Sequence, residues 1–298
     1  MNYKKIDTFS NWTKDEKDQF TVSVIKGLII DGVRKANSGH PGGPMSLADF
    51  SYILYSEYLI FDKDNPDWHS RDRLVLSVGH TCMLLYVLLY LSDILDMDDL
   101  KEFRQLHSRT PGHPEIETPG VDANTGPLGQ GVGMATGMAL AERMLSASAQ
   151  KDRKNYTYVL VGDGDLQEPI ALGAATLAGH WKLSQLVMFY DKNDIQIAGK
   201  TSRCDSTNYT ELFKAMNWDV QEIDGHDHQA IRKAIENAQV SPLPSIIIGN
   251  TTESQQQYER QPTNPNYDKP DTTLIEVKIQ ARCRITSDKM FLQKGENL

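Results

Sequence analysis

The amino-acid sequence predicts an α/β fold, namely a doubly wound parallel sheet with helices on both faces. Apolar runs at residues 156–161 and 186–190 have the length and composition of two buried strands. Residues 165–192 leave room for a loop, one helix and the second strand of a βαβ crossover. Helical and strand-like segments continue to alternate up to residue 248, which is typical of a parallel sheet covered on both faces.

The first elements are helical. Thr13 and Glu16 have the spacing of a capping box and predict a helix that ends near residue 38. A turn is expected at His40-Pro-Gly-Gly-Pro44, because proline fixes φ and glycine frees it. The next expected elements are a helix at 47–59 capped by Ser46, a strand at 73–78 and a buried helix at 82–91.

The central part begins with a loop at residues 107–125, which three prolines interrupt. The glycine-rich stretch 126–133 then enters a helix that runs to about residue 149. Gly133 and Gly137 lie four residues apart in this helix, so we expect it to approach a neighbouring backbone closely. After the βαβ unit, the sequence predicts helices at 209–216 and 228–239 and strands at 218–223 and 245–248.

We expect two regions. Residues 1–250 form one domain, and residues 251–298 form a divergent tail. Within the tail, a polar mobile loop is expected up to residue 271, because that stretch contains prolines and a glutamine run. Residues 275–285 alternate apolar and mainly charged side chains, which predicts one half-buried strand.

The composition is that of an ordinary soluble globular protein. The 298 residues are 39% hydrophobic and 24% charged, with a formal net charge of -9. This acidic balance argues against nucleic-acid or anionic-membrane partners, which select basic surfaces. Three widely spaced cysteines indicate neither a disulfide framework nor a zinc site. Neither a signal-like apolar segment nor an 18-residue apolar run is present, so we expect a cytoplasmic location.

Two polar side chains follow the two strands of the predicted βαβ unit. Asp163 lies in Gly162-Asp163-Gly164 after the first strand, and Asn193 follows the second. Adjacent parallel strands deliver both side chains to the sheet edge where open α/β sheets bind ligands. Their oxygen atoms suit a hard divalent cation, which usually completes its shell with phosphate oxygens and water. The pair therefore favours a metal–diphosphate site over a simple tight turn.

The remaining motifs are weaker when each is considered alone. Gly129, Gly131 and Gly133 are no dinucleotide fingerprint, because Met134 stands where the last glycine of GxGxxG belongs. Packing of a helix on the sheet is the simpler explanation for these glycines.

Four of the eight histidines lie in loops marked by glycine or proline, namely His40, His80, His113 and His226. Loops at one edge of a sheet can bring their side chains into one cleft. Neutral imidazoles there can donate to phosphate and hydroxyl groups or move protons. From spacing alone, a shared site and separate structural roles both remain open.

Taken together, these residues resemble the N-terminal, diphosphate-binding domain of transketolase. The resemblance runs in order from about residue 15 to residue 250. Six motifs carry it: Asn37–Met45, Arg71–Arg73 with Gly79-His80, Thr110–Glu115, Thr125–Gly131, Gly162–Gly164 and Ile223–Asp227.

The resemblance implies that residues 1–250 have a thiamine-diphosphate-binding fold, with thiamine diphosphate and Mg2+ (or Ca2+) as cofactors. Asp163, the Asn193 side chain and the Ile195 carbonyl would hold the cation against the diphosphate. The other implied cofactor-site residues are His80 and Gly162 to Gly164 at the diphosphate, Gly126 to Leu128 beside the rings, and Glu168 near a subunit contact.

The resemblance also implies an activity, which is transfer of a two-carbon ketol unit from a ketose or its phosphate to an aldose or its phosphate. His40, His113 and His226 would line the substrate channel and hydrogen-bond the sugar hydroxyls and the enolate oxygen. The cofactor would act as the electron sink for cleavage of the ketose C2–C3 bond.

The chain resembles about half of a transketolase. In the family, the carboxylate that activates the aminopyrimidine belongs to the following domain, and a chain ending at Leu298 has no room for one of ordinary size. We therefore expect the N-terminal subunit of a split enzyme. It would be active only with a C-terminal-half subunit that carries the pyrimidine-binding domain, in an α2β2 assembly.

Three departures from the family pattern leave alternatives open. Pro169 and Asp194 stand where the family usually has glycine, and Asn250–Ser254 replaces its Lys-Thr-x-x-Gly segment. One alternative is half of another thiamine-diphosphate carboligase, and another is a non-catalytic scaffold subunit derived from transketolase. The Thr110–Glu115 run and the four loop histidines favour binding of a ketose substrate, and therefore favour a transketolase over another thiamine-diphosphate carboligase.

Overall fold

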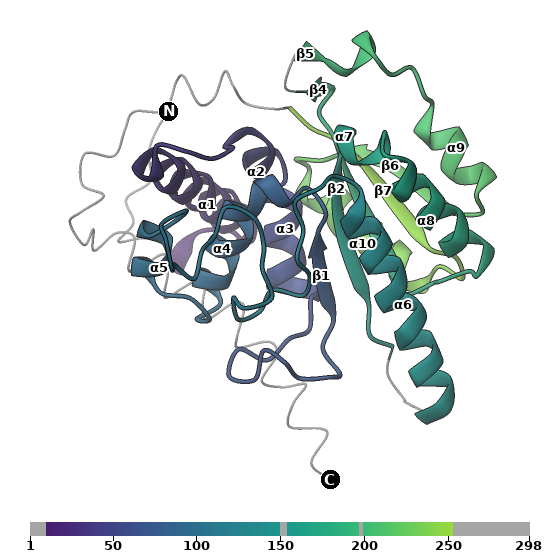
Figure 1. The fold of residues 1–298 in the computed structure, drawn as a ribbon, viewed down its shortest axis with the longest axis horizontal. Helices are drawn as coiled ribbons and strands as arrows, with labels where there is room; N and C mark the ends of the chain where they lie inside the picture. Colours follow the sequence, from purple (N-terminus) through teal and green to yellow (C-terminus); the bar gives the residue numbers. More distant parts are fainter. Residues whose placement is uncertain (1–9, 150–153, 197–198, 253–298) are drawn as a thin grey trace.

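The computed structural model describes residues 10–149, 154–196 and 199–252. Within these ranges the chain forms a five-stranded sheet in the order β1-β2-β3-β7-β6, and all four strand pairings are parallel. Helices cover both faces of this sheet (Figure 1). The predicted fold class is confirmed, whereas the loop and strand expected in the tail lie outside the described residues.

The five strands lie at the predicted positions, and four of them are apolar runs. The central strands β2, β3 and β7 are buried along almost their whole length, whereas the edge strand β6 is half-exposed. A parallel strand buried on both faces needs a continuous apolar run, and this is the pattern that the sequence shows. Their bounds are β1 (Arg73–Leu76), β2 (Thr157–Gly162), β3 (Leu186–Lys192), β6 (Asp219–Asp224) and β7 (Ser245–Asn250).

The side chains of each strand contribute alternately to two separate hydrophobic cores, because successive side chains point to opposite faces of the sheet. One face carries α1 (Lys14–Ala36), α3 (Ala48–Ile53), α4 (Cys82–Leu91) and α10 (His228–Val240). The opposite face carries α6 (Gln130–Ala149), α8 (Pro169–His180) and α9 (Tyr209–Ala215). Phe50 of α3 stacks on Phe189 of β3 with ring centroids 3.9 Å apart, which anchors the first core.

Several helix boundaries follow the sequence signals. The Thr13 side chain accepts a hydrogen bond from the Glu16 backbone at 3.2 Å, and Glu16 accepts one from the Thr13 backbone at 2.9 Å. The predicted capping box is therefore confirmed. The helix ends at Asn37, whose φ of 47° is left-handed, and asparagine tolerates this conformation better than most residues. The buried helix predicted at 82–91 is α4, with the same bounds.

The turn predicted at residues 40–44 is wrong in part, because Gly42–Ser46 forms the short helix α2. Pro44 is tolerated there since the first turn of a helix leaves its N–H groups unpaired. Ser46 does not cap the next helix. Its hydroxyl donates to the Gly43 carbonyl at 3.0 Å and to Asp191, and α3 continues into a π-helical turn, η2 (Leu54–Tyr58).

Short elements also occupy segments for which the sequence predicted no helix or strand. Each is too short to show helical periodicity in the sequence. They are η3 (Gly79–Thr81), α5 (Met97–Lys101), α7 (Asp163–Leu166), η4 (Thr201–Arg203) and the antiparallel pair β4 (Ile195–Gln196) with β5 (Gly199–Lys200). In the described ranges, no helix combines the length and the apolar character needed to cross a membrane.

Candidate functional site

The carboxyl ends of β2 and β3 bring the two predicted cation ligands together. In the parallel register Val161 lies beside Tyr190, and Gly162 beside Asp191. Asp163 therefore begins α7 at the same sheet edge at which Asn193 follows β3. The backbone N–H groups of Asn193 and Asp194 face the Asp163 carboxyl group.

The Asp163 carboxylate is buried, with only 4% of the residue exposed. Its Oδ1 accepts a hydrogen bond from the Tyr190 hydroxyl at 2.5 Å, whereas its Oδ2 is buried without a hydrogen-bond partner. Burial raises the pKa of Asp163, the Tyr190 hydrogen bond opposes this, and the charge of Asp194 adds to it. A buried carboxylate oxygen without a partner is costly, and a cation at this position would remove that cost.

Asn193 lies in a tight turn between β3 and β4. Its Nδ2 donates to Asp191 at 3.1 Å, and its Oδ1 accepts from the Ile195 backbone N–H at 3.0 Å. Asp194 between them has a φ of 60°, and aspartate is among the residues that tolerate this left-handed conformation. Asp at this position is therefore compatible with a turn in which the family usually has glycine.

The residues fit a hard cation better than a transition metal. Within the described ranges, no cluster of three or more His, Cys, Asp or Glu side chains is arranged to hold a metal. The candidate set instead combines the free oxygen of Asp163 with the amide oxygen of Asn193 and, as the resemblance implies, the main-chain carbonyl of Ile195. Oxygen ligands of these kinds suit Mg2+ and Ca2+, particularly where phosphate oxygens complete the shell.

Glycines allow the loop that precedes α6 to lie directly against the strand ends. A Cβ atom on Gly79 would be 2.8 Å from the Thr125 carbonyl carbon, and one on Gly131 would be 2.5 Å from the Ser77 Cα. Both distances are too short for any side chain, so these backbones meet only because glycine stands there. The glycine-rich stretch therefore packs a helix on the sheet, as the simpler explanation proposed, and lies beside Asp163 as well.

The same loop contacts the start of the crossover helix. A Cβ atom on Gly164 would be 3.0 Å from Leu128, and one on Gly129 would be 2.7 Å from the Glu168 Cβ. Gly129 also has a φ of 78°, which favours glycine. Glu168 precedes α8 and is half-buried. The predicted residues from 126–128, 162–164 and 168 thus line one edge of the sheet.

Asp165 forms hydrogen bonds to three segments at this edge of the sheet, although no sequence pattern predicted a role for it. Its fully buried carboxylate accepts hydrogen bonds from the Ser77 hydroxyl at 2.7 Å, the Gly129 backbone at 2.7 Å and the Gly162 backbone at 3.0 Å. Burial raises the pKa of Asp165, and the three hydrogen bonds counter this effect. The sequence offers only one hint of this role, namely that Asp165 lies two residues after the predicted ligand Asp163. The other signals are missing because Ser77 and Gly129 are distant from Asp165 in sequence.

Three of the four loop histidines form one cluster. The rings of His40 and His80 lie edge to face, with centroids 4.9 Å apart. The His113 ring covers Gly126, where a Cβ atom would be 3.5 Å from it. Burial lowers the pKa of His80 to about 4, and His40, His113 and Arg104 contribute further. The His80 imidazole is therefore neutral at pH 7 and can donate a hydrogen bond.

Arg104 is a second residue that sequence reasoning missed. Its guanidinium donates to the Ser38 hydroxyl at 2.9 Å and to the Gly112 carbonyl at 3.4 Å. Burial lowers the pKa values of His40 and His113, and Arg104 lowers both further. A permanent cation beside neutral imidazoles makes this edge favourable for an anionic ligand. No sequence pattern identified Arg104, because it lies in irregular structure.

His226 has different partners. Its Nδ1 lies 3.0 Å from Asp49, and its Nε2 accepts the Thr252 backbone N–H at 3.2 Å. It follows β6, which forms the sheet edge opposite β1, and no described contact joins it to the other three loop histidines. Asp49 also binds His228 at 2.8 Å and Lys26 at 3.0 Å.

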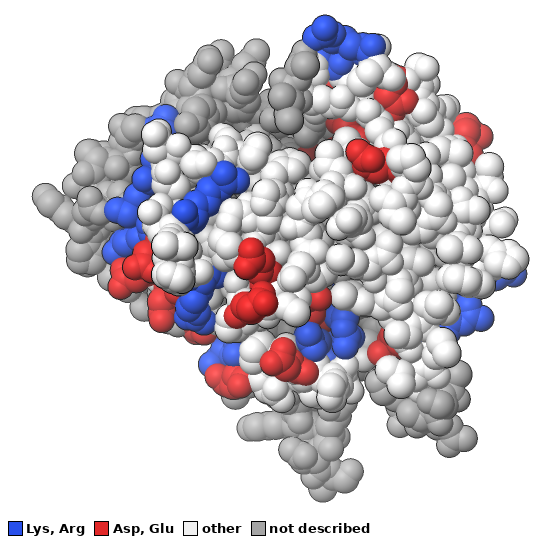
Figure 2. Space-filling view, viewed as in Figure 1, with Lys and Arg blue, Asp and Glu red and all other residues white. Residues whose placement is uncertain are grey.

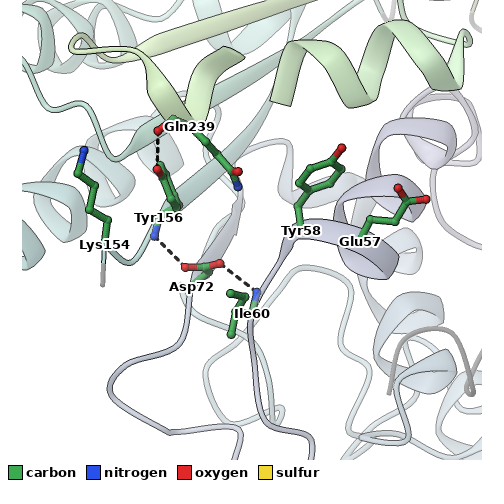
Figure 3. A pocket seen from close by; sticks show the side chains of 7 residues that line it. All are labelled: Glu57, Tyr58, Ile60, Asp72, Lys154, Tyr156 and Gln239. Atoms are coloured by element: carbon green, nitrogen blue, oxygen red, sulfur yellow. Dashed lines mark hydrogen bonds between the residues drawn. The ribbon is translucent and has the colours of Figure 1, made fainter. Parts of the chain in front are cut away.

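A separate hollow of about 480 Å3 opens at the amino ends of β1 and β2, away from Asp163 (Figure 3). Several of its polar groups bond to one another, and Glu57 and Tyr58 bond to residues outside the lining. The Asp72 carboxylate accepts from the Tyr156 and Ile60 backbones, and the Tyr156 hydroxyl donates to the Gln239 carbonyl at 2.6 Å. The lining residues are Glu57, Tyr58, Ile60, Asp72, Lys154, Tyr156 and Gln239. We therefore place the functional site at the carboxyl edge.

Comparison with known proteins shows the family of the chain. Residues 17–265 match the family described as "Transketolase, thiamine diphosphate binding domain". The chain belongs to this family. Transketolase of Halalkalibacterium halodurans is 48% identical over 242 residues, which cover 79% of this chain and 36% of that protein. The chain thus spans about a third of the length of this curated transketolase.

Solved transketolase structures have the same fold. The Campylobacter jejuni enzyme superposes with a TM-score of 0.85 at 38% identity, covering 94% of this chain and 48% of that one. A Pichia stipitis transketolase in complex with sedoheptulose-7-phosphate gives a TM-score of 0.84 at 33% identity, covering 93% and 45%. The resemblance inferred from six motifs is therefore confirmed at the level of the transketolase family and its thiamine-diphosphate-binding domain.

Proposed function

We propose that this chain is the cofactor-binding part of a transketolase, which transfers a two-carbon ketol unit from a ketose or its phosphate to an aldose or its phosphate. One observation carries the proposal. In a chain of this family, the buried Oδ2 of Asp163 lacks a partner at the sheet edge where Asn193 and a glycine-lined loop converge. This arrangement fits a cation that binds a diphosphate.

In this proposal Asp163, Asn193 and the carbonyl of Ile195 hold Mg2+ or Ca2+. The cation offsets the charge of the diphosphate at a site that already contains the buried Asp163 carboxylate. Gly162 and Gly164 flank Asp163 and leave the diphosphate free access to the backbone.

The neighbouring residues have proposed roles toward the rest of thiamine diphosphate. His80 donates a hydrogen bond to the diphosphate, a role that its low pKa supports because the imidazole stays neutral. The backbone from Gly126 to Leu128 packs beside the cofactor rings. Glu168, at the start of α8, lies close to a contact between subunits.

When bound, thiamine diphosphate supplies the electron sink for cleavage of the ketose C2–C3 bond. The chain's own contribution is orientation and proton transfer. His40 and His113 hydrogen-bond sugar hydroxyls and move protons at the enolate oxygen, and their lowered pKa values support this role. The channel role of His226 stays a prediction, because its ring contacts Asp49 and Thr252.

We further propose that a C-terminal-half transketolase subunit supplies the pyrimidine-binding domain, in an α2β2 assembly. The chain covers 36% of the Halalkalibacterium halodurans transketolase and 48% of the Campylobacter jejuni chain. A cytoplasmic location stays a prediction from the sequence.

An apolar surface supports pairing of two such chains. Figure 2 shows few charged residues over α6 and α8 in this view. Five of the nine exposed large hydrophobic residues in the described part lie on these two helices. They are Met134, Met144 and Leu145 of α6, with Ile170 and Leu177 of α8, and we call this set the α6–α8 face. Exposed apolar residues that gather on two neighbouring helices often mark an interface.

Ketose phosphates are the proposed donors, in line with the sugar phosphate bound to the Pichia stipitis relative. The test is to co-purify the chain with its native partner and to screen ketose–aldose pairs in the presence of thiamine diphosphate and Mg2+. The complex should transfer the ketol unit. A complex that binds thiamine diphosphate but transfers no ketol unit would contradict the transketolase activity.

Replacement of the central ligand gives the matched test. Asp163→Ala should reduce turnover at least about a hundredfold even at saturating Mg2+, because the diphosphate loses its cation. Asp98→Ala removes an exposed carboxylate of α5 and should leave turnover unchanged. Wild-type turnover in the Asp163→Ala complex would refute the cation assignment.

A further inference from the structure

Asp191 is a buried carboxylate for which the proposed mechanism has no use. It lies near the end of β3, with 2% of the residue exposed, and three donors from different segments converge on it. The Ser46 hydroxyl of α2 donates at 2.5 Å, the Asn193 amide nitrogen donates at 3.1 Å, and the hydroxyl of Thr251, just after β7, also donates.

These contacts determine how the Asn193 side chain is turned. A carboxamide has a donor end and an acceptor end, and only its oxygen can bind a cation. A carboxylate such as Asp191 accepts hydrogen bonds, so it holds the nitrogen end of Asn193. The Oδ1 atom therefore points away from Asp191, and it accepts only the Ile195 backbone N–H among described groups. One lone pair of Oδ1 remains for a cation.

We propose that Asp191 is a positioning residue that selects the oxygen end of Asn193 for the cation, an inference that rests on the proposed function. Ser46 and Thr251 hold the Asp191 carboxylate in place from α2 and from the segment after β7. Groups that orient a metal ligand through a hydrogen bond typically change metal affinity 10- to 100-fold when they are removed. This orienting role explains why the buried Asp191 lies two positions before the ligand Asn193.

The test measures Mn2+ binding to the full chain in complex with its partner subunit and thiamine diphosphate, by the electron paramagnetic resonance signal of free Mn2+. Asp191→Ala should weaken Mn2+ binding about tenfold or more. Asp191→Asn keeps an acceptor for the Asn193 nitrogen and offers Thr251 a donor instead, so we expect binding within about threefold of wild type. If the two variants lose Mn2+ affinity to the same extent, the negative charge of Asp191 affects the cation and its hydrogen bond to Asn193 does not. That result would overturn the proposal.

A second pair of variants covers the case in which Asp191→Ala does not fold. Thr251→Val and Ser46→Ala each remove one hydroxyl that fixes the Asp191 carboxylate. Combined, they should weaken Mn2+ binding several-fold, while unfolding of the metal-free chain still shows a cooperative transition. Unchanged Mn2+ affinity in the double variant, or in Asp191→Ala, would overturn the proposal.

Failure of the proposed function gives a different result. If the wild-type complex binds no Mn2+ with thiamine diphosphate, or if the Asp163→Ala complex binds it as well as wild type, then the cation site itself is wrong and the proposed role of Asp191 is refuted as well. If Asp163→Ala abolishes binding and Asp191→Ala leaves it intact, only the role of Asp191 is refuted.

Discussion

At the scale of single residues, the histidine cluster combines burial with a neighbouring positive charge. His80 is the most strongly affected, because the partial burial of its ring and the neighbouring His40, His113 and Arg104 all oppose its protonation. Its pKa of about 4 lies below the ordinary value of 6.5. A proton therefore binds the unfolded chain more tightly than the folded one. The stability contributed by neutral His80 is complete above pH 6.5 and is lost as the pH falls toward 4.

The environment of His80 predicts the pH behaviour of its resonance and the effect of one arginine. In an NMR titration the His80 midpoint should lie well below 6.5, and Arg104→Gln should raise it because a neighbouring charge is removed. Arg109→Gln is the control, since Arg109 pairs with Asp99 and is not among the groups that shift His80. Between pH 6.5 and 4 the free energy of unfolding should fall by at most about 3 kcal/mol from this group. A midpoint at or above 6.5 would contradict the assigned environment.

The sequence predicted the residues whose position follows from strand ends, and it missed those that depend on contacts across the fold. Asp163 and Asn193 were identified because each follows an apolar run, so their proximity follows from βαβ topology. Asp165, Asp191 and Arg104 were not identified. Their partners lie far away in sequence, and a buried carboxylate has the same local pattern as a solvated one.

At the scale of elements, the close approach of α6 to the sheet depends on one glycine. Gly133 and Gly137 were expected from their spacing to let the helix approach a neighbouring backbone closely, but neither of them makes the contact with the sheet. A Cβ atom on Gly133 would reach only the Ile170 side chain, at 3.8 Å, and one on Gly137 would meet open space. Gly131 makes the contact instead, against the backbone of Ser77. Spacing identified the helix but could not show which of its faces meets β1.

This difference predicts opposite effects for two substitutions in the same helix. Gly131→Ala should destabilise the chain by about 1–3 kcal/mol, because the new methyl group overlaps the Ser77 backbone. Gly137→Ala should stabilise it by about 0.5–1 kcal/mol, because alanine favours the helix and the added atom has room. Urea unfolding of the two purified variants measures both changes. If the two variants have the same free energy of unfolding, the proposed contact of α6 with the Ser77 backbone is wrong.

Long elements were predicted well and short ones were not, for a physical reason. The buried strands and α4 are continuous apolar runs, and α1 carries its own capping box. Elements such as α2 and α7 consist of about one turn of helix, which is too short for periodicity to emerge. Their conformations are set by tertiary contacts, such as the hydrogen bond from Ser46 to Asp191.

At the scale of the whole molecule, the α6–α8 face is the surface expected to pair two chains. Leu177→Glu places a charge on this face and should shift the assembly toward smaller species, because a charge cannot be buried in an apolar interface without large cost. Val240→Glu is the matched control, because Val240 is 81% exposed and lies on α10, away from this face. Sedimentation velocity measures the mass of each variant. Identical masses for wild type and Leu177→Glu would refute pairing through this face.

Assembly was harder to predict from the sequence than the fold was. Net charge argued against some classes of partner, but no sequence pattern showed that exposed apolar residues of α6 and α8 would lie on one surface. That information arises only when the two helices pack side by side on the same face of the sheet.

The central claim is that a divalent cation held by Asp163 and Asn193 binds the diphosphate of thiamine diphosphate. Calorimetric titration of thiamine diphosphate into the chain, with its partner subunit bound, tests it most directly. We predict one binding site per chain with Mg2+, and loss of binding both with a chelator and in Asp163→Ala. Binding of equal strength without a divalent cation, or in the Asp163→Ala variant, would contradict the claim.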